Sequence, residues 1–435
     1  MNSLTITPKG SLRGTIRVPG DKSITHRALI LSALAEGPSV ISGYCQGEDC
    51  LNTLKALQDL GISIVQVGPN QVAVEGKGLW GLREADQPLD CGNSGTGLRL
   101  LAGVLAGQPF FSILTGDDSL RTRPMGRIAK PLRLMGAQIQ GRKEGELAPL
   151  AITGSRLHGI HYRSPVSSAQ IKSAVLLAGL IAEGETILEE PRLSRDHTER
   201  MFGYLGIPFE VESLCIRLKG GQSFRGKDLQ VPGDLSAAAF FIVGASIVPG
   251  SHITIEHVGL NPARIGILEI LQEMGANIEI HKAREEGGEP VGDLVITSAQ
   301  LRGISINSSQ VPKTIDEFPI FCIAASVAEG ETRVNGAQEL RVKETDRIHA
   351  MATELRKLNV SMEETPDGFV LAGGATIKGG SCTSYGDHRV AMAVAIAALL
   401  GDGPTVIEKT DCIDTSFPGF HDKLLELLTN SNQIL

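Results

Sequence analysis

Residues 19–27 read PGDKSITHR, and they join a strand-like run to an apolar, helix-like run at residues 28–35. Lys22, Ser23 and Arg27 therefore fall in about the first turn of a helix. Unpaired backbone N–H groups and the positive end of the helix dipole favour an anion at that place. Because cations there oppose the dipole, the stretch predicts an anion-binding site. The alternative is that Lys22 and Arg27 are ordinary solvated cations.

The apolar run after this stretch ends in a Gly turn followed by a β-rich run, and this pattern recurs six times. The copies read LSALAEGPSVI, GVLAGQPFFSI, GLIAEGETIL, ASIVPGSHITI, ASVAEGETRV and ALLGDGPTVI. An amphipathic helix pattern alternates with them, and its first five copies end in the expected left-handed terminators Gly61, Gly136, Gly206, Gly275 and Asn359. The repeating unit is therefore about 70 residues long, with two helices and several strands.

Six copies predict two domains of three copies each, and 435 residues suffice for two to three domains. The sequence VPGD at residues 18–21 recurs at residues 231–234, each time before a helix. We interpret these places as two crossings between the domains, which would act as hinges. Residues 21–231 would form the N-terminal domain, and residues 1–20 plus 232–435 would form the C-terminal domain.

Bulk composition argues against several classes of function. The net charge of −8 and an aromatic content of 4% argue against binding nucleic acid. No apolar run is long enough to span a bilayer, and the N-terminus does not resemble a signal peptide. The seven cysteines are scattered and form no C-x-x-C pair, which predicts a cytoplasmic protein without a disulfide framework or a metal site. We expect small-molecule ligands, no membrane partner and a monomer.

The starts of the six apolar helices are equivalent positions under this pseudo-symmetry. Four of them carry cations against the helix dipole, namely Lys22 with Arg27, Arg99, Lys172 and Arg389. The fourth copy carries no charge inside its helix, and the fifth, at residues 314–318, is acidic through Asp316 and Glu317. Residues 121–124 and 341–347 add further cations, and Thr345 is the expected N-cap of the helix around Ile348. Converging starts of this kind predict a site for a substrate with several negative charges, with one carboxylate available as a base.

Two glycine-rich stretches match nucleotide-binding motifs only in part. Residues 76–81 fit G-x-G-x-x-G, but no helix pattern follows before Pro88. Residues 221–227 resemble a P-loop, but Asp228 stands where Ser or Thr is required. We expect both stretches to be turns.

Six stretches together resemble the 5-enolpyruvylshikimate-3-phosphate (EPSP) synthase family, 3-phosphoshikimate 1-carboxyvinyltransferase: PGDKSITHRALILSALAEG, GNSGTGLRLLAG, RTRPMG, SSAQIKSAVLLAGL, LRVKETDRI and YGDHRVAMA. LSRDHTERM and DTSFPGF are similar to the sub-group called class II. The resemblance implies an α/β fold of two similar domains, each of three βαβαββ repeats, known as an inside-out α/β barrel. The implied reaction moves the enolpyruvyl group of phosphoenolpyruvate onto the 5-hydroxyl of shikimate 3-phosphate and releases phosphate. It belongs to the biosynthesis of chorismate and aromatic amino acids, and no cofactor is implied.

Both substrates are anionic, which explains clustered cations on an acidic protein. The resemblance implies that shikimate 3-phosphate is held by Lys22, Ser23, Arg27, Ser168, Gln170, Asp316 and Lys343. It implies that phosphoenolpyruvate is held by Lys22, Gly95, Arg123, Gln170, Arg347 and Arg389. Asp316 would be the base for the hydroxyl, and Glu344 would be the acid for the methylene group, with Lys22 assisting. Many family members carry a Lys before the last Phe-Pro, where this chain has Thr415 and Ser416.

The resemblance also has consequences for inhibition and for domain movement. Gly95 leaves room for glyphosate, the inhibitor that targets this family. Because Lys22 and Arg123 fall in one predicted domain and Asp316, Glu344 and Arg389 in the other, we expect ligand binding to close the domains.

Three other functions are weighed against this one. UDP-N-acetylglucosamine enolpyruvyl transferase shares the fold and the donor, but that family uses a loop Cys, and residues 115–127 contain none. A non-catalytic anion-binding protein of the same fold would not need acids such as Asp316 and Glu344 beside its anions. The RNA 3′-phosphate cyclase type would need a nucleotide site and a more basic surface. We therefore expect EPSP synthase activity.

Overall fold

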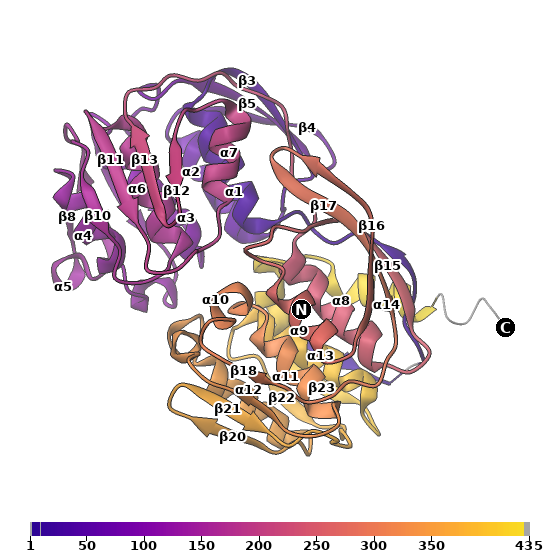
Figure 1. Ribbon diagram of the computed structural model, residues 1–435. Helices are drawn as coiled ribbons and strands as arrows, with labels where there is room; N and C mark the ends of the chain where they lie inside the picture. Colours follow the sequence, from indigo (N-terminus) through magenta and orange to yellow (C-terminus); the bar gives the residue numbers. More distant parts are fainter. Residues whose placement is uncertain (1, 9, 430–435) are drawn as a thin grey trace. The chain divides into compact units, whose positions relative to one another are not determined.

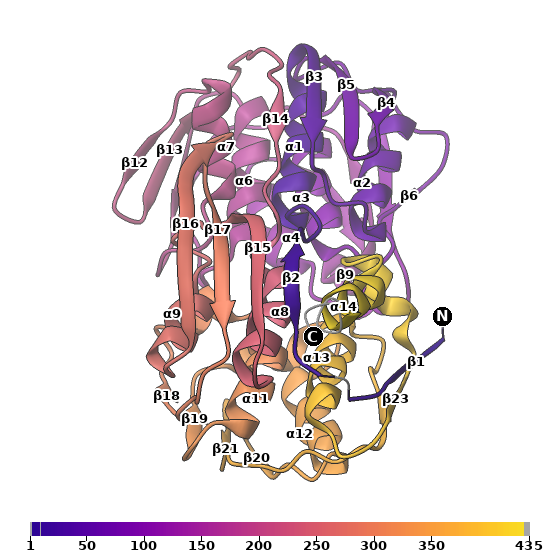
Figure 2. The same ribbon diagram turned by 90° about the vertical axis from the view of Figure 1, so that its right-hand side faces the viewer.

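The computed structural model describes residues 2–8 and 10–429 (Figure 1 and Figure 2). The chain divides into two compact units. We call them the N-terminal unit, which comprises Gly20–Val231 and Glu286–Glu289, and the C-terminal unit, which comprises the chain up to Pro19, Pro232–Glu285 and the chain from Pro290 onward. Among the described residues, no helix combines the length and the apolar character that a membrane crossing requires.

The N-terminal unit contains three four-stranded sheets within the described ranges, one for each of its repeats, and β14 from the end of the unit completes the first. The first sheet has the order β14–β3–β5–β4, from Leu229–Gln230, Glu36–Ser42, Gln71–Lys77 and Ser63–Gly68. The second has the order β6–β7–β9–β8, from Leu89–Asp90, Phe111–Thr115, Leu147–Thr153 and Gln138–Gly141. The third has the order β10–β11–β13–β12, from His161–Arg163, Glu185–Glu189, Cys215–Lys219 and Glu210–Glu212. In every sheet the first two strands are parallel and the others antiparallel.

The C-terminal unit repeats this plan, and the start of the chain completes two of its sheets. The fourth repeat forms β2–β15–β17–β16, from Arg13–Ile16, His252–Gly259, Glu289–Thr297 and Asn277–Glu286. The fifth forms β18–β19–β21–β20, from Ser305–Ile306, Thr332–Val334, Gly368–Leu371 and Met362–Thr365. The sixth forms β22–β23–β1, from Ser381–Thr383, Thr405–Glu408 and Ser3–Ile6. The predicted α/β fold of repeated βαβαββ units is therefore confirmed.

The first helix of each repeat is buried on all sides, and we call these six the inner helices. In the N-terminal unit they are α1 (Lys22–Leu34), α3 (Gly95–Leu105) and α6 (Ala169–Ile181). In the C-terminal unit they are α8 (Leu235–Ile247), α11 (Phe318–Val327) and α13 (His388–Ala397). Each set of three packs together in the core of its own unit. Apolar residues therefore cover nearly the whole circumference of these helices, as burial on every side requires.

The second helix of each repeat is amphipathic and covers the core with its apolar face. These outer helices are α2 (Glu48–Asp59), α4 (Gly126–Leu134), α7 (His197–Leu205), α9 (Gly266–Glu273), α12 (Arg347–Lys357) and α14 (Phe420–Thr429). All five predicted terminators, from Gly61 to Asn359, have positive φ, as the sequence pattern predicted. The remaining helices are short, at Arg142–Gly145 (α5), Val311–Thr314 (α10), Leu120–Thr122, Gln338–Val342, Ala398–Leu400 and Thr410–Thr415.

The chain passes between the units at Pro19–Gly20 and at Val231–Pro232. At Gly20 a Cβ would lie 1.9 Å from the carbonyl oxygen of Gly43, so no larger residue fits this backbone. A third passage has no counterpart in the sequence analysis. The tip of the β16–β17 hairpin, Glu286–Glu289, belongs to the N-terminal unit, where Glu289 Oε1 lies 2.7 Å from His197 Nδ1 in a buried pair.

Candidate active site

Side-chain caps fix the first turns of five inner helices. The capping residues are Asp21, Ser94, Ser168, Asp234 and Asp387, and each accepts a hydrogen bond from a backbone N–H of the first turn. Helix α11 differs, because it begins at Phe318 and Glu317 makes no capping bond from its side chain. Asp316 therefore lies in the turn that precedes this helix.

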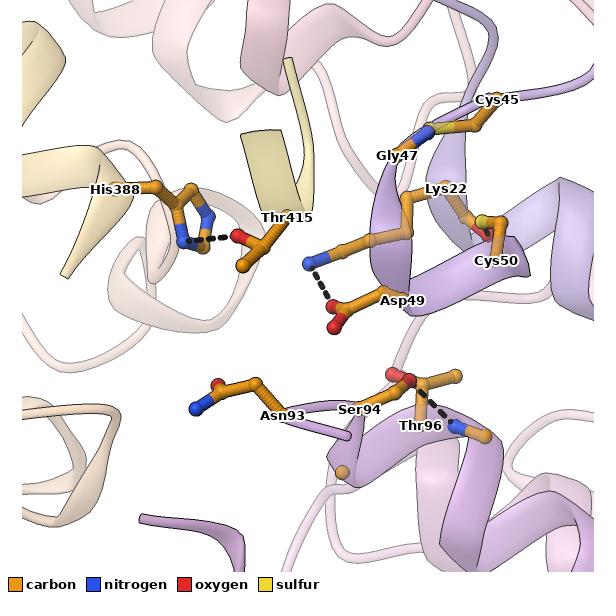
Figure 3. A network of polar contacts seen from close by, with 12 residues as sticks. Lys22, Cys45, Gly47, Asp49, Cys50, Asn93, Ser94, Thr96, His388 and Thr415 are labelled. Carbon is orange, nitrogen blue, oxygen red and sulfur yellow. Dashed lines mark hydrogen bonds and ion pairs between the residues drawn. The ribbon is translucent and has the colours of Figure 1, made fainter. Parts of the chain in front are cut away.

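Lys22, at the start of α1, forms an ion pair with Asp49 in the N-terminal unit. Lys22 Nζ lies 2.9 Å from Asp49 Oδ2, which α2 supplies (Figure 3). The Lys22 side chain is 16% exposed, so its ammonium is partly withdrawn from water but remains accessible. No sequence pattern indicated Asp49, because a single acid on a helix carries no distinctive spacing.

Arg27 is more deeply buried than a freely solvated cation would be. Its Nε donates to Thr198 Oγ1 over 2.8 Å, its Nη2 to Ser173 Oγ over 2.7 Å, and its Nη1 to the carbonyl of Ser23 over 2.8 Å. Burial lowers the pKa of Arg27 to about 10. These contacts use three of the five N–H donors of the guanidinium. The solvated alternative for Arg27 is thus wrong, while its contact with shikimate 3-phosphate stays a prediction.

Gly95, Gln170 and Arg123 form a second group in the same unit. Arg99 connects them, because its Nη1 donates to Gln170 Oε1 over 2.6 Å and would lie 2.6 Å from a Cβ at Gly95. Gln170 Nε2 also donates to Thr96 Oγ1 over 2.9 Å. Arg123 Nη1 lies 3.5 Å from the same Cβ position. Gln170 is thus fixed in orientation by Thr96 and by Arg99, which is one of the cations predicted at the helix starts.

Two residues at the start of α6 are held within the N-terminal unit. Ser168 Oγ caps the helix by accepting from Ile171 N. Lys172 lies in the first turn of α6, as expected, but its ammonium is not available there as a free cation. Its ammonium is buried and lies 2.9 Å from Glu190 and 2.7 Å from Glu199, which follow it by 18 and 27 residues. Lys172 is therefore part of a buried ion cluster inside the unit.

Five of the predicted residues come together in the C-terminal unit. Asp316 Oδ1 lies 3.7 Å from Lys343 Nζ and 3.6 Å from Arg347 Nη1. Arg347 Nη2 lies 2.7 Å from Glu344 Oε2. Arg389 Nη1 donates to the backbone carbonyl of Asp316 over 3.0 Å. The two carboxylates proposed for proton transfer therefore share one guanidinium group.

Arg347 is the centre of this cluster and is only 2% exposed. Its Nε donates to Asp387 Oδ2 over 2.8 Å, and Asp387 in turn caps α13. Burial acts to lower the pKa of Arg347, but Asp387, Glu344 and Asp316 outweigh it and the net shift is upward. The N-cap of α12 is Asp346 instead of the expected Thr345, because Asp346 Oδ1 accepts from His349 N over 3.1 Å.

The segment where other members carry a Lys presents a hydroxyl group here. Thr415 Oγ1 lies 3.3 Å from His388 Nδ1, at the start of α13 (Figure 3). Within the described part of the chain, no group of three or more His, Cys, Asp or Glu residues is arranged to hold a metal ion. The charged clusters of the two units thus consist of ammonium, guanidinium, amide and carboxylate groups.

Six βαβαββ repeats carry these clusters, and known proteins are similar to this chain in both sequence and fold. Residues 6–424 match the family described as EPSP synthase (3-phosphoshikimate 1-carboxyvinyltransferase). The 3-phosphoshikimate 1-carboxyvinyltransferase of Desulforamulus reducens is 51% identical, over 98% of this chain and 99% of that protein. That of Geotalea uraniireducens is 52% identical, over 97% and 98%. The structure of EPSP synthase from Acinetobacter baumannii matches with a TM-score of 0.88 and 45% identity over 98% of both chains. The chain belongs to the EPSP synthase family.

Proposed function

We propose that this protein transfers the enolpyruvyl group of phosphoenolpyruvate to the 5-hydroxyl of shikimate 3-phosphate and releases inorganic phosphate. One observation carries the proposal beyond family membership. Asp316, Lys343, Glu344 and Arg347 form a single contact cluster, in which two carboxylates accompany cations suited to anionic substrates. A site that only bound anions would gain nothing from carboxylates placed there.

The chemistry is an addition followed by an elimination. The 5-oxygen attacks C2 of phosphoenolpyruvate and loses its proton to Asp316, while C3 gains a proton and becomes a methyl group. The tetrahedral intermediate carries the 5-oxygen, the phosphate oxygen, the carboxylate and the methyl group on C2. It then releases phosphate, and the methyl group gives up a proton to restore the double bond. Addition therefore moves one proton from the hydroxyl and one proton to C3, and elimination removes one proton from C3.

Asp316 is suited to the role of base because the two cations beside it stabilise its ionised form. Glu344 would protonate C3, with Lys22 assisting. The contact of Glu344 with Arg347 favours the ionised form of Glu344. Its acid role therefore requires the carboxylate of phosphoenolpyruvate to take over part of Arg347 on binding.

Substrate binding is proposed to use the cations that the family motifs share. Shikimate 3-phosphate would contact Lys22, Ser23, Arg27, Ser168, Gln170, Asp316 and Lys343. Phosphoenolpyruvate would contact Lys22, Gly95, Arg123, Gln170, Arg347 and Arg389. The guanidinium groups match carboxylate and phosphate oxygens in pairs, and Gly95 lets a ligand approach the backbone closely.

Because these residues are divided between the two units, we propose that both substrates together close the domains about residues 18–21 and 231–234. The tip at Glu286–Glu289 would follow the N-terminal unit, to which its buried contact with His197 ties it. We further propose that the enzyme is a monomer of the cytoplasm. All seven cysteines are free thiols, as a reducing compartment permits.

The test is to incubate the purified protein with phosphoenolpyruvate and either shikimate 3-phosphate or UDP-N-acetylglucosamine, and to follow phosphate release. We expect phosphate release from phosphoenolpyruvate when shikimate 3-phosphate is the acceptor, and none when UDP-N-acetylglucosamine is the acceptor. Release only with UDP-N-acetylglucosamine would assign the sister activity. Saturable binding of shikimate 3-phosphate without release would identify a non-catalytic anion-binding protein. Light scattering on the purified protein would test the oligomeric state. A mass near 46.1 kDa is expected for a monomer, and a mass near twice that value would contradict it.

A further inference from the structure

Glu317, the residue after the proposed base, is a buried carboxylate that caps no helix. It is 2% exposed and stands at the N-cap position of α11 without making a capping bond from its side chain. Its Oε1 accepts a hydrogen bond from Ser236 Oγ. Among the described residues, its Oε2 has no hydrogen-bond partner. Burying a carboxylate is costly, so this side chain calls for an explanation beyond helix formation.

Ser236 connects Glu317 to a buried cation in the fourth repeat. It lies in the first turn of α8, where its backbone N–H donates to Asp234 Oδ1 over 2.8 Å. Arg264 Nη2 donates to Ser236 Oγ over 2.5 Å and to Asp234 Oδ1 over 3.1 Å. Glu317, Ser236, Arg264 and Asp234 are all buried and form one polar network.

This network ends at both chain crossings. The backbone N–H of Asp234 donates to the carbonyl of Pro19 over 2.8 Å, and Gly233 N donates to the carbonyl of His257 over 2.7 Å. Pro19 is the last residue of the C-terminal unit before the first passage, and Asp234 lies two residues after Pro232, where the chain re-enters that unit. The turn that carries the base is thus hydrogen-bonded, through Ser236, to the place where the chain leaves the unit.

The same turn is held from the opposite side by the sixth repeat. Arg389, in the first turn of α13, donates to the backbone carbonyl of Asp316. The pair Asp316–Glu317 therefore joins the starts of three inner helices, with α8 bound through Glu317, α11 following it directly and α13 bound through Asp316. A peptide fixed at both residues keeps the carboxylate of Asp316 at one place.

We propose that Glu317 is a positioning residue for the general base, acting through the backbone it shares with Asp316 and through its bond to Ser236. The inference rests on the proposed function, because it assumes that Asp316 accepts the hydroxyl proton. Removing the bond frees one side of the turn, and a displacement of about 1 Å at a reacting group can cost on the order of 10²-fold in rate. Asp316 is only one of seven proposed contacts of shikimate 3-phosphate and none of those of phosphoenolpyruvate, so kcat should fall much more than the KM values change.

Four variants separate positioning from simple stability. Glu317→Ala should lower kcat about 10- to 100-fold with both KM values within about threefold. Glu317→Gln should recover most of kcat, because its amide oxygen still accepts from Ser236. Ser236→Ala removes the donor of the same hydrogen bond, so it should reproduce the loss of kcat. It takes the place of Glu317→Ala if the Glu317→Ala protein does not fold. Glu273→Ala, an exposed glutamate at the end of α9, is the matched control and should leave kcat unchanged.

The deciding measurement is a double-mutant cycle with Asp316→Asn, read as single-turnover product formation. If Glu317 acts through Asp316, then Glu317→Ala adds less than about twofold to the loss in the Asp316→Asn background. A loss that multiplies fully in both backgrounds would overturn the inference, as would Glu317→Gln being as slow as Glu317→Ala. Either result would overturn only the inference about Glu317, because the proposed function is supported as long as the wild-type enzyme is active. A wild type that releases no phosphate would overturn both.

Discussion

Arg347 Nη2 lies 2.7 Å from Glu344 Oε2, although the two side chains differ in their exposure to water. Arg347 is almost completely buried, whereas the Glu344 side chain is 19% exposed. The same guanidinium contacts Asp387, which is fully buried, and lies 3.6 Å from Asp316. One interior cation thus sets the charge around both residues proposed to transfer protons.

Replacing this cation should cost both stability and activity. Arg347→Met leaves Asp387 buried without its charged partner, and breaking a buried pair in this way costs about 3–5 kcal/mol. Arg347→Lys keeps the charge and should lose less. The measurement is unfolding in urea followed by circular dichroism. Arg356→Met, at an exposed position of α12, is the control and should shift the free energy of unfolding by less than about 0.5 kcal/mol. Equal stability of Arg347→Met and wild type would contradict the buried network.

Gly95→Ala should weaken phosphoenolpyruvate binding while leaving the fold intact. The new methyl group would lie 2.6 Å from Arg99 Nη1, the end of a flexible side chain, so the arginine moves instead of the backbone. Arg99 then loses its bond to Gln170. We expect the KM for phosphoenolpyruvate, which Gly95 and Gln170 are both proposed to contact, to rise roughly tenfold, the equivalent of about 1.4 kcal/mol. The KM for shikimate 3-phosphate, which involves Gln170 but not Gly95, should rise less.

The control for this substitution is Gly203→Ala in α7, where the nearest side-chain atom to a Cβ is 4.0 Å away. An alanine in a helix with room for it should leave both KM values unchanged and slightly stabilise the protein. If Gly95→Ala had the kinetics of Gly203→Ala, the contact between Gly95 and Arg99 would have no part in binding.

His26 should make stability depend on pH. Its ring lies 2.8 Å from Thr53 Oγ1 and 3.2 Å from Ser94 Oγ, and burial, followed by Lys22 and Arg27, lowers its pKa to about 3. Below the unfolded value near 6.5 the unfolded chain binds a proton that the folded chain does not. The contribution of neutral His26 is therefore complete above that pH and declines toward pH 3, approaching about 1.4 kcal/mol per pH unit.

The measurement is the free energy of unfolding of wild type and His26→Gln at pH 7, 6 and 5. Gln cannot titrate, so the difference between the two proteins should shrink as the pH falls. Two curves that run parallel over this range would show that the pKa of His26 in the folded protein equals its unfolded value, as it would for a ring exposed to water.

Domain closure predicts a change of size in solution. Phosphoenolpyruvate and shikimate 3-phosphate together, with product formation slowed by Asp316→Asn, should reduce the radius of gyration measured by X-ray scattering. Phosphoenolpyruvate alone should have a smaller effect, because its proposed contacts are fewer. An unchanged radius of gyration with both ligands at saturation would rule out closure about the two crossings.

Local patterns in the sequence were enough to predict the repeats, because each helix needs a terminating residue at its end regardless of what packs against it. Gly61 and Asn359 show this, since both adopt the left-handed conformation that their positions predicted. The orientation of side chains was less accessible. Lys172 turns inward because Glu190 and Glu199 neutralise it, and neither partner is recognisable from the helix start alone.

The candidate site shows the same limit. Sequence patterns indicated Asp316, Glu344 and Arg347, because a carboxylate suggests proton transfer and a guanidinium suggests anion binding. They did not indicate Asp49 or Ser236, which act by holding other side chains and come from distant segments. Arg99 was indicated only as a cation at a helix start, and its bond to Gln170 was not foreseen. The tip at Glu286–Glu289 was also missed, because its attachment depends on a buried contact with His197 and on no local pattern.

The most direct test of the proposed chemistry is the reaction of phosphoenolpyruvate with shikimate 3-phosphate in D₂O, followed by proton and phosphorus NMR. Addition converts C3 to a methyl group that carries one deuterium, and elimination removes one of its three hydrogens. We therefore expect one phosphate per molecule of product and deuterium in the vinyl methylene group of that product, with both slowed in Glu344→Gln. A product whose methylene group contains no deuterium would contradict protonation at C3, and absence of product would contradict the proposed activity itself.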